Sequence, residues 1–152
     1  MSPIRRVVSK QLGELLIERG ILKKKELEKA LSIQKEKGGL LGNILVVLGY
    51  ATEEQIAQAI TVQYGFPYLP LANYDIDQSL ITVIPENVAK QYCLIGIDKI
   101  SNTLTIAMAN PLNMQAVEDV ELMTGCKVQA FVSTMTDINN AIKKNYQKKP
   151  KQ

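Results

Sequence analysis

Two glycines and two glutamines recur at matching places early in the chain, and their chemistry is that of hydrogen-bonded recognition. Gly13 and Gln34 in one segment match Gly42 and Gln63 in a second segment, 29 residues later. A glutamine amide both donates and accepts hydrogen bonds, and a glycine lets another group approach the backbone closely. An amphipathic helix needs neither residue, so their repetition calls for a functional explanation.

These residues belong to two similar units of 24 residues, 11–34 and 40–63, separated by a spacer of five residues, 35–39. Identical or conservative residues fill about half of each unit. Repeated apolar residues alone predict that the same pair of helices occurs twice. The identical pairs are Leu12 and Leu41, Gly13 and Gly42, Leu16 and Leu45, Gly20 and Gly49, Ala30 and Ala59, and Gln34 and Gln63.

Each unit is predicted to fold as a helix that ends at a glycine, followed by a second helix. In the first unit, Gly20 follows apolar residues at helical spacing, where a left-handed residue would end the helix. In the second unit, Gly49 has the same place, and Thr52 with Gln55 forms the T-x-x-Q pattern of a capping box. The position aligned with Thr52 is Lys23, whose side chain is a poor N-cap.

The chain changes character after Gly65, where two prolines and an Asn-Tyr-Asp turn predict an extended connector. Two β-branched segments, 93–98 and 103–109, flank a polar turn and predict an antiparallel hairpin. A third strand is predicted at 127–133, with a helix before it and another after it. The order β-β-α-β-α predicts a three-stranded sheet with helices packed on one face.

The predicted fold class is therefore α+β. Tandem helical hairpins, with four short helices in all, precede a small three-stranded sheet with its helices. The predicted parts are a tandem-repeat helical subdomain at 1–65, an extended connector at 66–75, an α+β subdomain at 76–147 and a basic tail or linker start at 148–152.

Composition excludes several classes of function. Histidine is absent, and the two cysteines, Cys93 and Cys126, are far apart, which argues against a zinc site, a histidine-based nucleophilic site and a disulfide framework. Eight of the 18 basic side chains lie in residues 1–10 and 143–152, which carry no acid, leaving ten basic against 15 acidic residues. The rest of the chain therefore has a net negative charge, which argues against a surface that binds DNA or RNA. Without an apolar run long enough to span a bilayer, the expected compartment is the cytosol.

The two units, with their spacer, resemble the MshEN domain, the N-terminal region of type II secretion and type IV pilus assembly ATPases. That family repeats the pattern RLG-x-x-L-x-x-x-G and then L-x-x-x-L-x-x-Q at this spacing. IPENVAKQY, LTIAMANPLN and the final DINNAI helix are similar to the rest of the domain. The resemblance covers about residues 10–147.

The resemblance implies binding of cyclic di-GMP, with one guanine half held by each unit. The glycines would admit the ligand to the backbone at helix starts, the glutamines would pair with guanine edges, and the leucines would supply an apolar surface. No cofactor or metal is implied. The implied contacts are Leu12, Gly13, Leu27, Leu31, Gln34, Leu41, Gly42, Ile56, Ile60 and Gln63, with Gln11 as a further candidate.

The chain departs from the family at the arginine that leads each motif, since Gln11 and Leu40 occupy those positions. A missing cation at a site for a dianion would cost on the order of 1 to 3 kcal/mol. Leu-Gly and Leu-x-x-x-Leu patterns are also typical of ordinary core packing. The adjacent carboxylates Glu53-Glu54 and Glu118-Asp119 are most simply interpreted as solvated helix faces.

Two functions remain open, and neither is enzymatic, because the chain has no G-x-x-x-x-G-K-[ST] phosphate-binding loop. One is a regulatory domain that binds cyclic di-GMP and passes that state to an attached ATPase. The other is a docking module that holds the ATPase to the cytoplasmic domain of an inner-membrane assembly protein, through residues 76–147, and binds no nucleotide. Both place the chain at the cytoplasmic side of the inner membrane.

Overall fold

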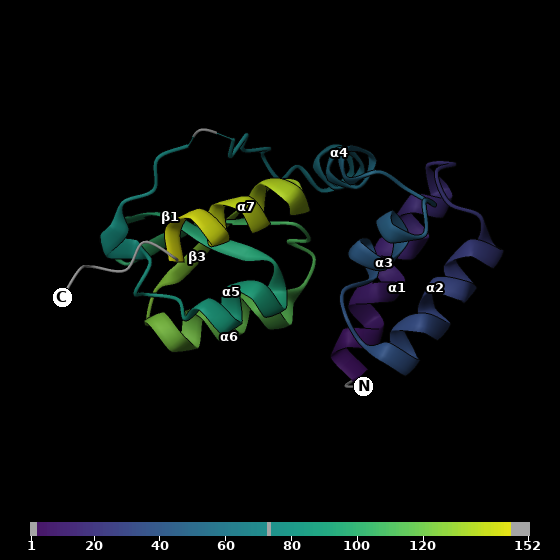
Figure 1. Ribbon diagram of the computed structural model, residues 1–152, viewed down its shortest axis with the longest axis horizontal. Helices are drawn as coiled ribbons and strands as arrows, with labels where there is room; N and C mark the ends of the chain where they lie inside the picture. Colours follow the sequence, from purple (N-terminus) through teal and green to yellow (C-terminus); the bar gives the residue numbers. More distant parts are fainter. Residues whose placement is uncertain (1–2, 73, 147–152) are drawn as a thin grey trace.

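A computed structural model of the chain describes residues 3–72 and 74–146. Four helices form what we call the helical half, and α4 lies between the other three helices and the sheet (Figure 1). Among the described residues, no helix is both long enough and apolar enough to cross a membrane. The helices of this half are α1 (Pro3–Glu18), α2 (Lys24–Lys37), α3 (Leu41–Val47) and α4 (Glu53–Tyr64).

Local signals set the ends of these helices as predicted. Gly20 and Gly49 adopt left-handed backbone angles, with φ of +75° and +78°. The capping box at α4 is confirmed, because Thr52 Oγ1 accepts from the Gln55 N–H at 3.1 Å and Gln55 Oε1 accepts from the Thr52 N–H at 2.9 Å. Lys23 provides no side-chain cap, and instead its own N–H donates to the Glu26 carboxylate at 2.9 Å.

The first helix begins much earlier than predicted, which changes the position of Gly13. The helix was expected to start near Leu12, but α1 begins at Pro3. Proline suits the first position of a helix, and residues 4–12 contain no glycine or proline to interrupt it. The expectation that Gly13 lies at a helix start is therefore wrong, and its N–H belongs to the interior of a helix.

The second half, which we call the sheet half, contains the predicted three strands in the order β1-β2-β3. The predicted antiparallel hairpin is confirmed, with β1 and β2 joined through Ser101 and Asn102. Strands β2 and β3 are parallel, and α6 is the crossover between them. The elements are η1 (Gln78–Leu80), α5 (Glu86–Tyr92), β1 (Leu94–Ile100), β2 (Thr103–Met108), α6 (Met114–Thr124), β3 (Lys127–Val132) and α7 (Met135–Tyr146).

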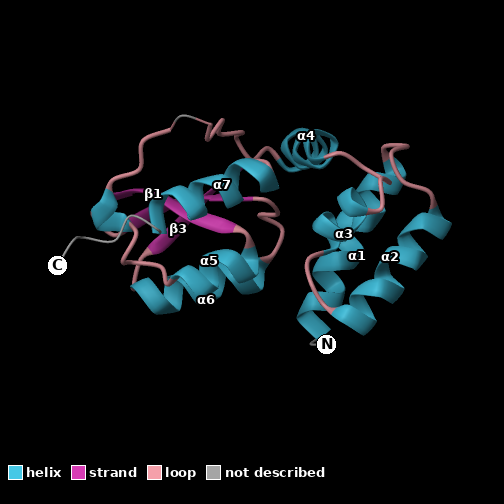
Figure 2. Ribbon diagram, viewed as in Figure 1, coloured by secondary structure: helices cyan, strands magenta, loops and turns pink. Residues whose placement is uncertain are grey.

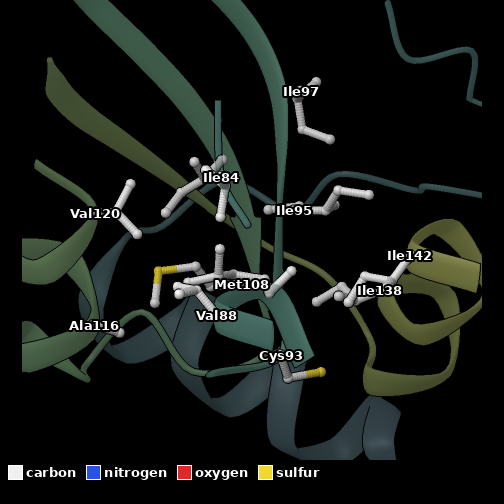
Figure 3. Close-up of a cluster of buried hydrophobic side chains, with 14 of the residues drawn as sticks. Ile84, Val88, Cys93, Ile95, Ile97, Met108, Ala116, Val120, Ile138 and Ile142 are labelled. Atoms are coloured by element: carbon white, nitrogen blue, oxygen red, sulfur yellow. The ribbon is translucent and has the colours of Figure 1, made fainter. Parts of the chain in front are cut away.

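Helices cover both faces of the sheet, so the expectation of one covered face is wrong (Figure 2). Successive residues of a strand point to opposite faces, and the neighbours Leu94 and Ile95 are both fully buried. Figure 3 shows Val120 of α6 on one side of the strands and Ile138 and Ile142 of α7 on the other. The parallel crossover explains this arrangement, because it places α6 on one face and leaves the other face to α7.

The two halves share buried side chains where they meet. Val132, at the end of β3, is fully buried within the apolar cluster of the helical half. In the other direction, Leu40 and Val46 pack against the cluster of the sheet half. The connector expected at 66–75 passes along β3, where the Leu69 N–H donates to the Val132 carbonyl at 2.9 Å. The basic tail expected at 148–152 lies outside the described residues.

Candidate ligand-binding site

A cavity of about 300 Å³ lies between the helical half and the sheet half. Its walls come from segments that are far apart in the sequence, namely the two repeat units with their spacer, the end of α5, the segment that leads from β2 into α6 and the segment that leads from β3 into α7. The helical half contributes Leu12, Gln34, Gly39, Leu40, Leu41, Gly42, Glu53, Ile56 and Ala57, and the sheet half contributes Tyr92, Ala109, Asn110, Asn113, Gln115, Ser133, Thr134 and Met135.

The structure gathers five of the repeat residues expected to contact a ligand in this cavity and places the other six elsewhere. The five are Leu12, Gln34, Leu41, Gly42 and Ile56. Among the others, Gln11 and Gln63 are exposed, Leu27 and Ile60 are buried in the core of the helical half, and Leu31 packs against that core. Gly13 is the sixth, and its environment shows why the repeat is not symmetric.

The two matching glycines have different surroundings. A Cβ added at Gly13 would lie 2.5 Å from Leu27 Cδ1, so this glycine permits close packing of α1 against α2. A Cβ added at Gly42 would lie 3.8 Å from Ile56 Cδ1 and 3.9 Å from Met135 Sδ, which are ordinary contact distances. Gly42 therefore leaves space in the cavity that a side chain would fill, whereas Gly13 allows α1 and α2 to pack closely.

The two matching glutamines also differ. Gln34 is 4% exposed, and its Nε2 donates to the Gly39 carbonyl at 3.0 Å. This bond ties the end of α2 to the spacer that leads into α3, so Gln34 shapes the cavity as well as lining it. Gln63 lies exposed near the end of α4 and does not line the cavity.

The sheet half supplies polar side chains that were not among the predicted ligand contacts. Asn110 Oδ1 accepts from the Leu112 N–H at 3.1 Å, and Asn113 caps α6 by accepting from the Ala116 N–H at 3.2 Å. Thr134 Oγ1 accepts from the Asp137 N–H at 3.2 Å at the start of α7. Capping patterns were the available signal for Asn113 and Thr134, but no local pattern shows that these caps face the repeat.

A hydrogen-bonded network links Tyr92, Asp119 and Gln115 beside the cavity. The Tyr92 hydroxyl donates to Asp119 Oδ2, and Gln115 Nε2 donates to Asp119 Oδ1 at 2.8 Å. Tyr92 and Gln115 line the cavity, while Asp119 lies behind Gln115 on α6. The interpretation of Asp119 as part of a solvated face is therefore wrong, whereas the neighbouring Glu118 is exposed.

Glu53 is the one charged side chain among the residues that line the cavity. Its carboxylate accepts from both the N–H and the hydroxyl of Thr136, at the start of α7. We call these two bonds the Glu53–Thr136 bridge. The solvated-face interpretation is wrong for Glu53 as well, although Glu54 is exposed.

The electrostatics of the cavity favour an uncharged group over an anion. None of the lining residues is lysine or arginine, and the two positions aligned with the family arginine carry Leu40, which lines the cavity, and Gln11, which does not. Burial, with a smaller contribution from the Glu53 carboxylate, raises the pKa of the nearby Cys93 thiol to about 12, so it is no nucleophile at neutral pH. Within the described ranges, no three histidine, cysteine or carboxylate side chains gather as metal ligands.

Comparison with known proteins connects this geometry with one family. The model of the MshEN domain matches residues 64–152, beyond the repeat. The type IV pilus assembly ATPase PilB of Myxococcus xanthus is 30% identical over 142 residues, which are 93% of this chain and 25% of that protein. PilB of Thermus thermophilus is 32% identical over 139 residues, which are 90% of this chain and 16% of that protein. The chain thus spans a quarter or less of these relatives.

Solved structures show the same fold over nearly the whole chain. The structure of MshE with cdg has 28% sequence identity and a TM-score of 0.65, and the match covers 89% of this chain and 98% of that one. The N-terminal domain of XpsE has 26% identity and a TM-score of 0.62, with 94% of this chain and 96% of that one covered. Both matches include the helical half as well as the sheet half.

Proposed function

This chain belongs to the MshEN domain family, and on that premise we propose that it binds cyclic di-GMP as the regulatory N-terminal part of a type IV pilus or type II secretion assembly ATPase. The observation that carries the proposal is the cavity between the two halves, which five of the repeat residues line. The two relatives described above are PilB assembly ATPases, and the similar structure of MshE was solved with cdg, which we take as cyclic di-GMP.

The size and lining of the cavity suit one guanine with part of its ribose. A volume of about 300 Å³ is at the lower end of the range for small-molecule sites, too small for a whole cyclic dinucleotide. Leu12, Leu41 and Ile56 offer apolar surface for a flat base, and the amides of the sheet half offer hydrogen bonds. The phosphates and the second half of the ligand would extend past the exposed Gly39 into solvent.

A ligand in this cavity would touch both halves at once, which is the basis of the regulatory role. Its binding energy would favour one arrangement of the helical half against the sheet half over any other. The attached ATPase, acting at the cytoplasmic face of the inner membrane, would sense that preference through the sheet half.

Calorimetric titration of the chain with cyclic di-GMP tests the proposal. We expect saturable binding, and we expect Gln34→Ala to weaken it by about fivefold or more, the effect of one lost hydrogen bond. Gln63→Ala is the matched control, because the same amide is removed from a position outside the cavity. We expect it to change affinity less than about twofold.

Two results would contradict this proposal in different ways. An absence of heat at ligand concentrations of tens of micromolar would overturn binding itself. Equal losses in Gln34→Ala and Gln63→Ala would instead place the ligand across both repeat units, as the resemblance implies, and not in the cavity alone.

Docking of a protein partner is a second candidate, favoured by exposed apolar side chains on α6. Leu122 is 84% exposed, Met114 56% and Met123 45%. The partner would be the cytoplasmic domain of an inner-membrane assembly protein. If docking is the function, Leu122→Ser will abolish capture of that purified domain, and the wild-type chain will bind it whether or not cyclic di-GMP is present.

A further inference from the structure

A second cavity, of about 270 Å³, lies between the connector and α7, and it has no described lining residue in common with the candidate ligand-binding site. The connector passes over α7 on the side of the sheet half away from α6 (Figure 1). We propose that this surface binds a second copy of the chain, with α7 of one copy against α7 of the other across a two-fold axis. The lining residues are Leu71, Ala72 and Tyr74 of the connector and Asp137, Asn140, Ala141, Lys144 and Asn145 of α7.

Four of the α7 residues at this cavity form a row with one charge at each end. Asp137, Asn140, Ala141 and Lys144 are spaced at i, i+3, i+4 and i+7, so they share one side of the helix, and we call them the α7 row. Asp137 lies in the first turn and Lys144 in the last, about 10 Å apart along the helix axis. Neither side chain forms an ion pair with another residue that the structure describes, so both charges are available to a partner.

The α7 row is complementary to itself when two copies of the helix meet antiparallel. A two-fold axis between positions 140 and 141 would place Asp137 of each copy opposite Lys144 of the other, so the favourable pair would occur twice. At the axis, Ala141 is small enough for close approach. The Asn140 amide both donates and accepts hydrogen bonds, so it can pair with its own copy. A second copy therefore carries the spacing of charges that this surface requires.

The surface beside the α7 row has the composition of a protein interface. Residues 55–74, which include most of α4 and the connector, contain no charged side chain. Tyr74 is 38% exposed at the cavity, and Tyr68 is 44% exposed. Tyr68 lies close to the row, since burial and then the Asp137 and Glu54 carboxylates raise the pKa of its hydroxyl. Interfaces are enriched in tyrosine and depleted in charge at their centre, as this surface is.

Sedimentation velocity of the full chain, without nucleotide, tests the inference. We expect a reversible equilibrium of monomer and dimer, with a dissociation constant on the order of 10 to 100 micromolar for a contact of this small size. Asp137→Lys and Lys144→Glu each place like charges opposite one another twice, and we expect each to weaken dimerisation at least about tenfold. The double variant restores opposite charges, so its dissociation constant should lie within about threefold of wild type.

Lys143→Glu is the matched control, because it reverses the same charge at the adjacent exposed position, outside the α7 row. We expect it to change the dissociation constant less than about twofold. Circular dichroism checks the folding of each variant, since an acid at Asp137 favours the start of the helix. If Asp137→Lys does not fold, Asn140→Arg replaces it, because two guanidinium groups brought together at the axis should also weaken dimerisation at least about tenfold.

This inference goes beyond the proposed function, and the two can fail separately. A chain that stays monomeric at about 500 micromolar would overturn the dimer and leave the binding of cyclic di-GMP untouched. A dimer that tolerates the single charge reversals, or that the double variant does not restore, would place the contact on another surface and overturn the inference as well. An absence of nucleotide binding in calorimetry would overturn the proposed function alone.

Discussion

Glu53 and Thr136, which are 83 positions apart in the chain, are joined by two hydrogen bonds to the same carboxylate. Glu53 lies in the first turn of α4 and Thr136 in the first turn of α7. One side chain of the helical half therefore caps a helix of the sheet half. Because Glu53 also lines the cavity, this bridge holds the two halves together at the site itself.

Replacing the Glu53 carboxylate should destabilise the fold. Glu53→Gln converts charge-assisted hydrogen bonds into neutral ones and removes one of the two acceptors, so we expect the free energy of unfolding to fall by about 1 to 2 kcal/mol. Glu54→Gln removes the same charge from the same helical turn without touching the bridge, and we expect about 0.5 kcal/mol or less. Urea unfolding measures the free energy of unfolding of both variants. Equal decreases in Glu53→Gln and Glu54→Gln would show that the Glu53–Thr136 bridge contributes nothing to stability.

Alanine substitutions should separate the roles of the two matching glycines. At Gly13 the new Cβ would meet Leu27 Cδ1 at 2.5 Å, so overpacking should outweigh the gain in helix propensity. We expect the free energy of unfolding to fall by about 1 kcal/mol, as measured by urea titration. An increase in stability would mean that Leu27 moves aside at no cost.

Gly42→Ala should weaken ligand binding without lowering the stability of the fold. Its Cβ would have no contact shorter than 3.8 Å, so stability should be unchanged or rise by up to about 1 kcal/mol. The methyl group would nevertheless occupy part of the cavity, and we expect cyclic di-GMP to bind about three- to tenfold more weakly by calorimetry. Unchanged affinity would place the ligand away from this wall.

Restoring an arginine should strengthen binding, and the position should matter. Leu40 lines the cavity, so Leu40→Arg would bring a guanidinium to its rim, where the ligand phosphates are expected. A charge-assisted hydrogen bond of about 1.5 to 3 kcal/mol corresponds to roughly ten- to a hundredfold in the dissociation constant. Gln11→Arg, exposed and outside the cavity wall, should tighten binding less, and the reverse order would contradict the proposed position of the phosphates.

Stability should decline in mildly alkaline solution because of Cys93. Its thiol has a pKa of 9.0 in the unfolded chain and about 12 when folded, since burial disfavours the thiolate. Above pH 9 the unfolded state loses this proton while the folded state keeps it, so raising the pH favours unfolding. At pH 10 this effect should have lowered the free energy of unfolding by about 1.4 kcal/mol. The contribution from Cys93 should be absent in Cys93→Ala.

Tyr146 should add to this decline at higher pH. Burial, together with the nearby Glu86 carboxylate, raises the pKa of its hydroxyl from 10.0 to about 12. At pH 10 Tyr146 already contributes about 0.4 kcal/mol, so the difference between wild type and Cys93→Ala, in which this contribution cancels, isolates the effect of Cys93. Urea titrations of wild type and Cys93→Ala at pH 8, 9 and 10 provide the measurement, and parallel curves would contradict the assignment.

Features decided within one turn of the chain were predictable from the sequence. Thr52 and Gln55 close a capping box through contacts three residues apart, and Gly20 ends its helix by adopting an angle that other residues avoid. The start of α1 has a local signal too, because Pro3 suits a first helical position and residues 4–12 contain no glycine or proline, although the repeat itself begins only at residue 11.

The candidate site was predictable only on its helical side. The repetition of Gln34 and Gly42 draws attention to them, but the partners that face them, such as Asn110 and Gln115, are single residues in the other half. Which carboxylate of a pair turns inward depends on elements that pack against it from far along the chain. Glu53 and Asp119 are inward in this sense, and their neighbours are not.

Val132 has a further consequence for how a signal would travel. It ends β3, yet its side chain is held in the apolar cluster of the helical half, and Ser133 and Thr134 lead directly from it into α7. A tilt of the four N-terminal helices cannot leave Val132 behind without opening a void. A movement of the helical half would therefore reach β3 and the start of α7 through Val132, together with the contacts of Leu40, Val46 and Glu53.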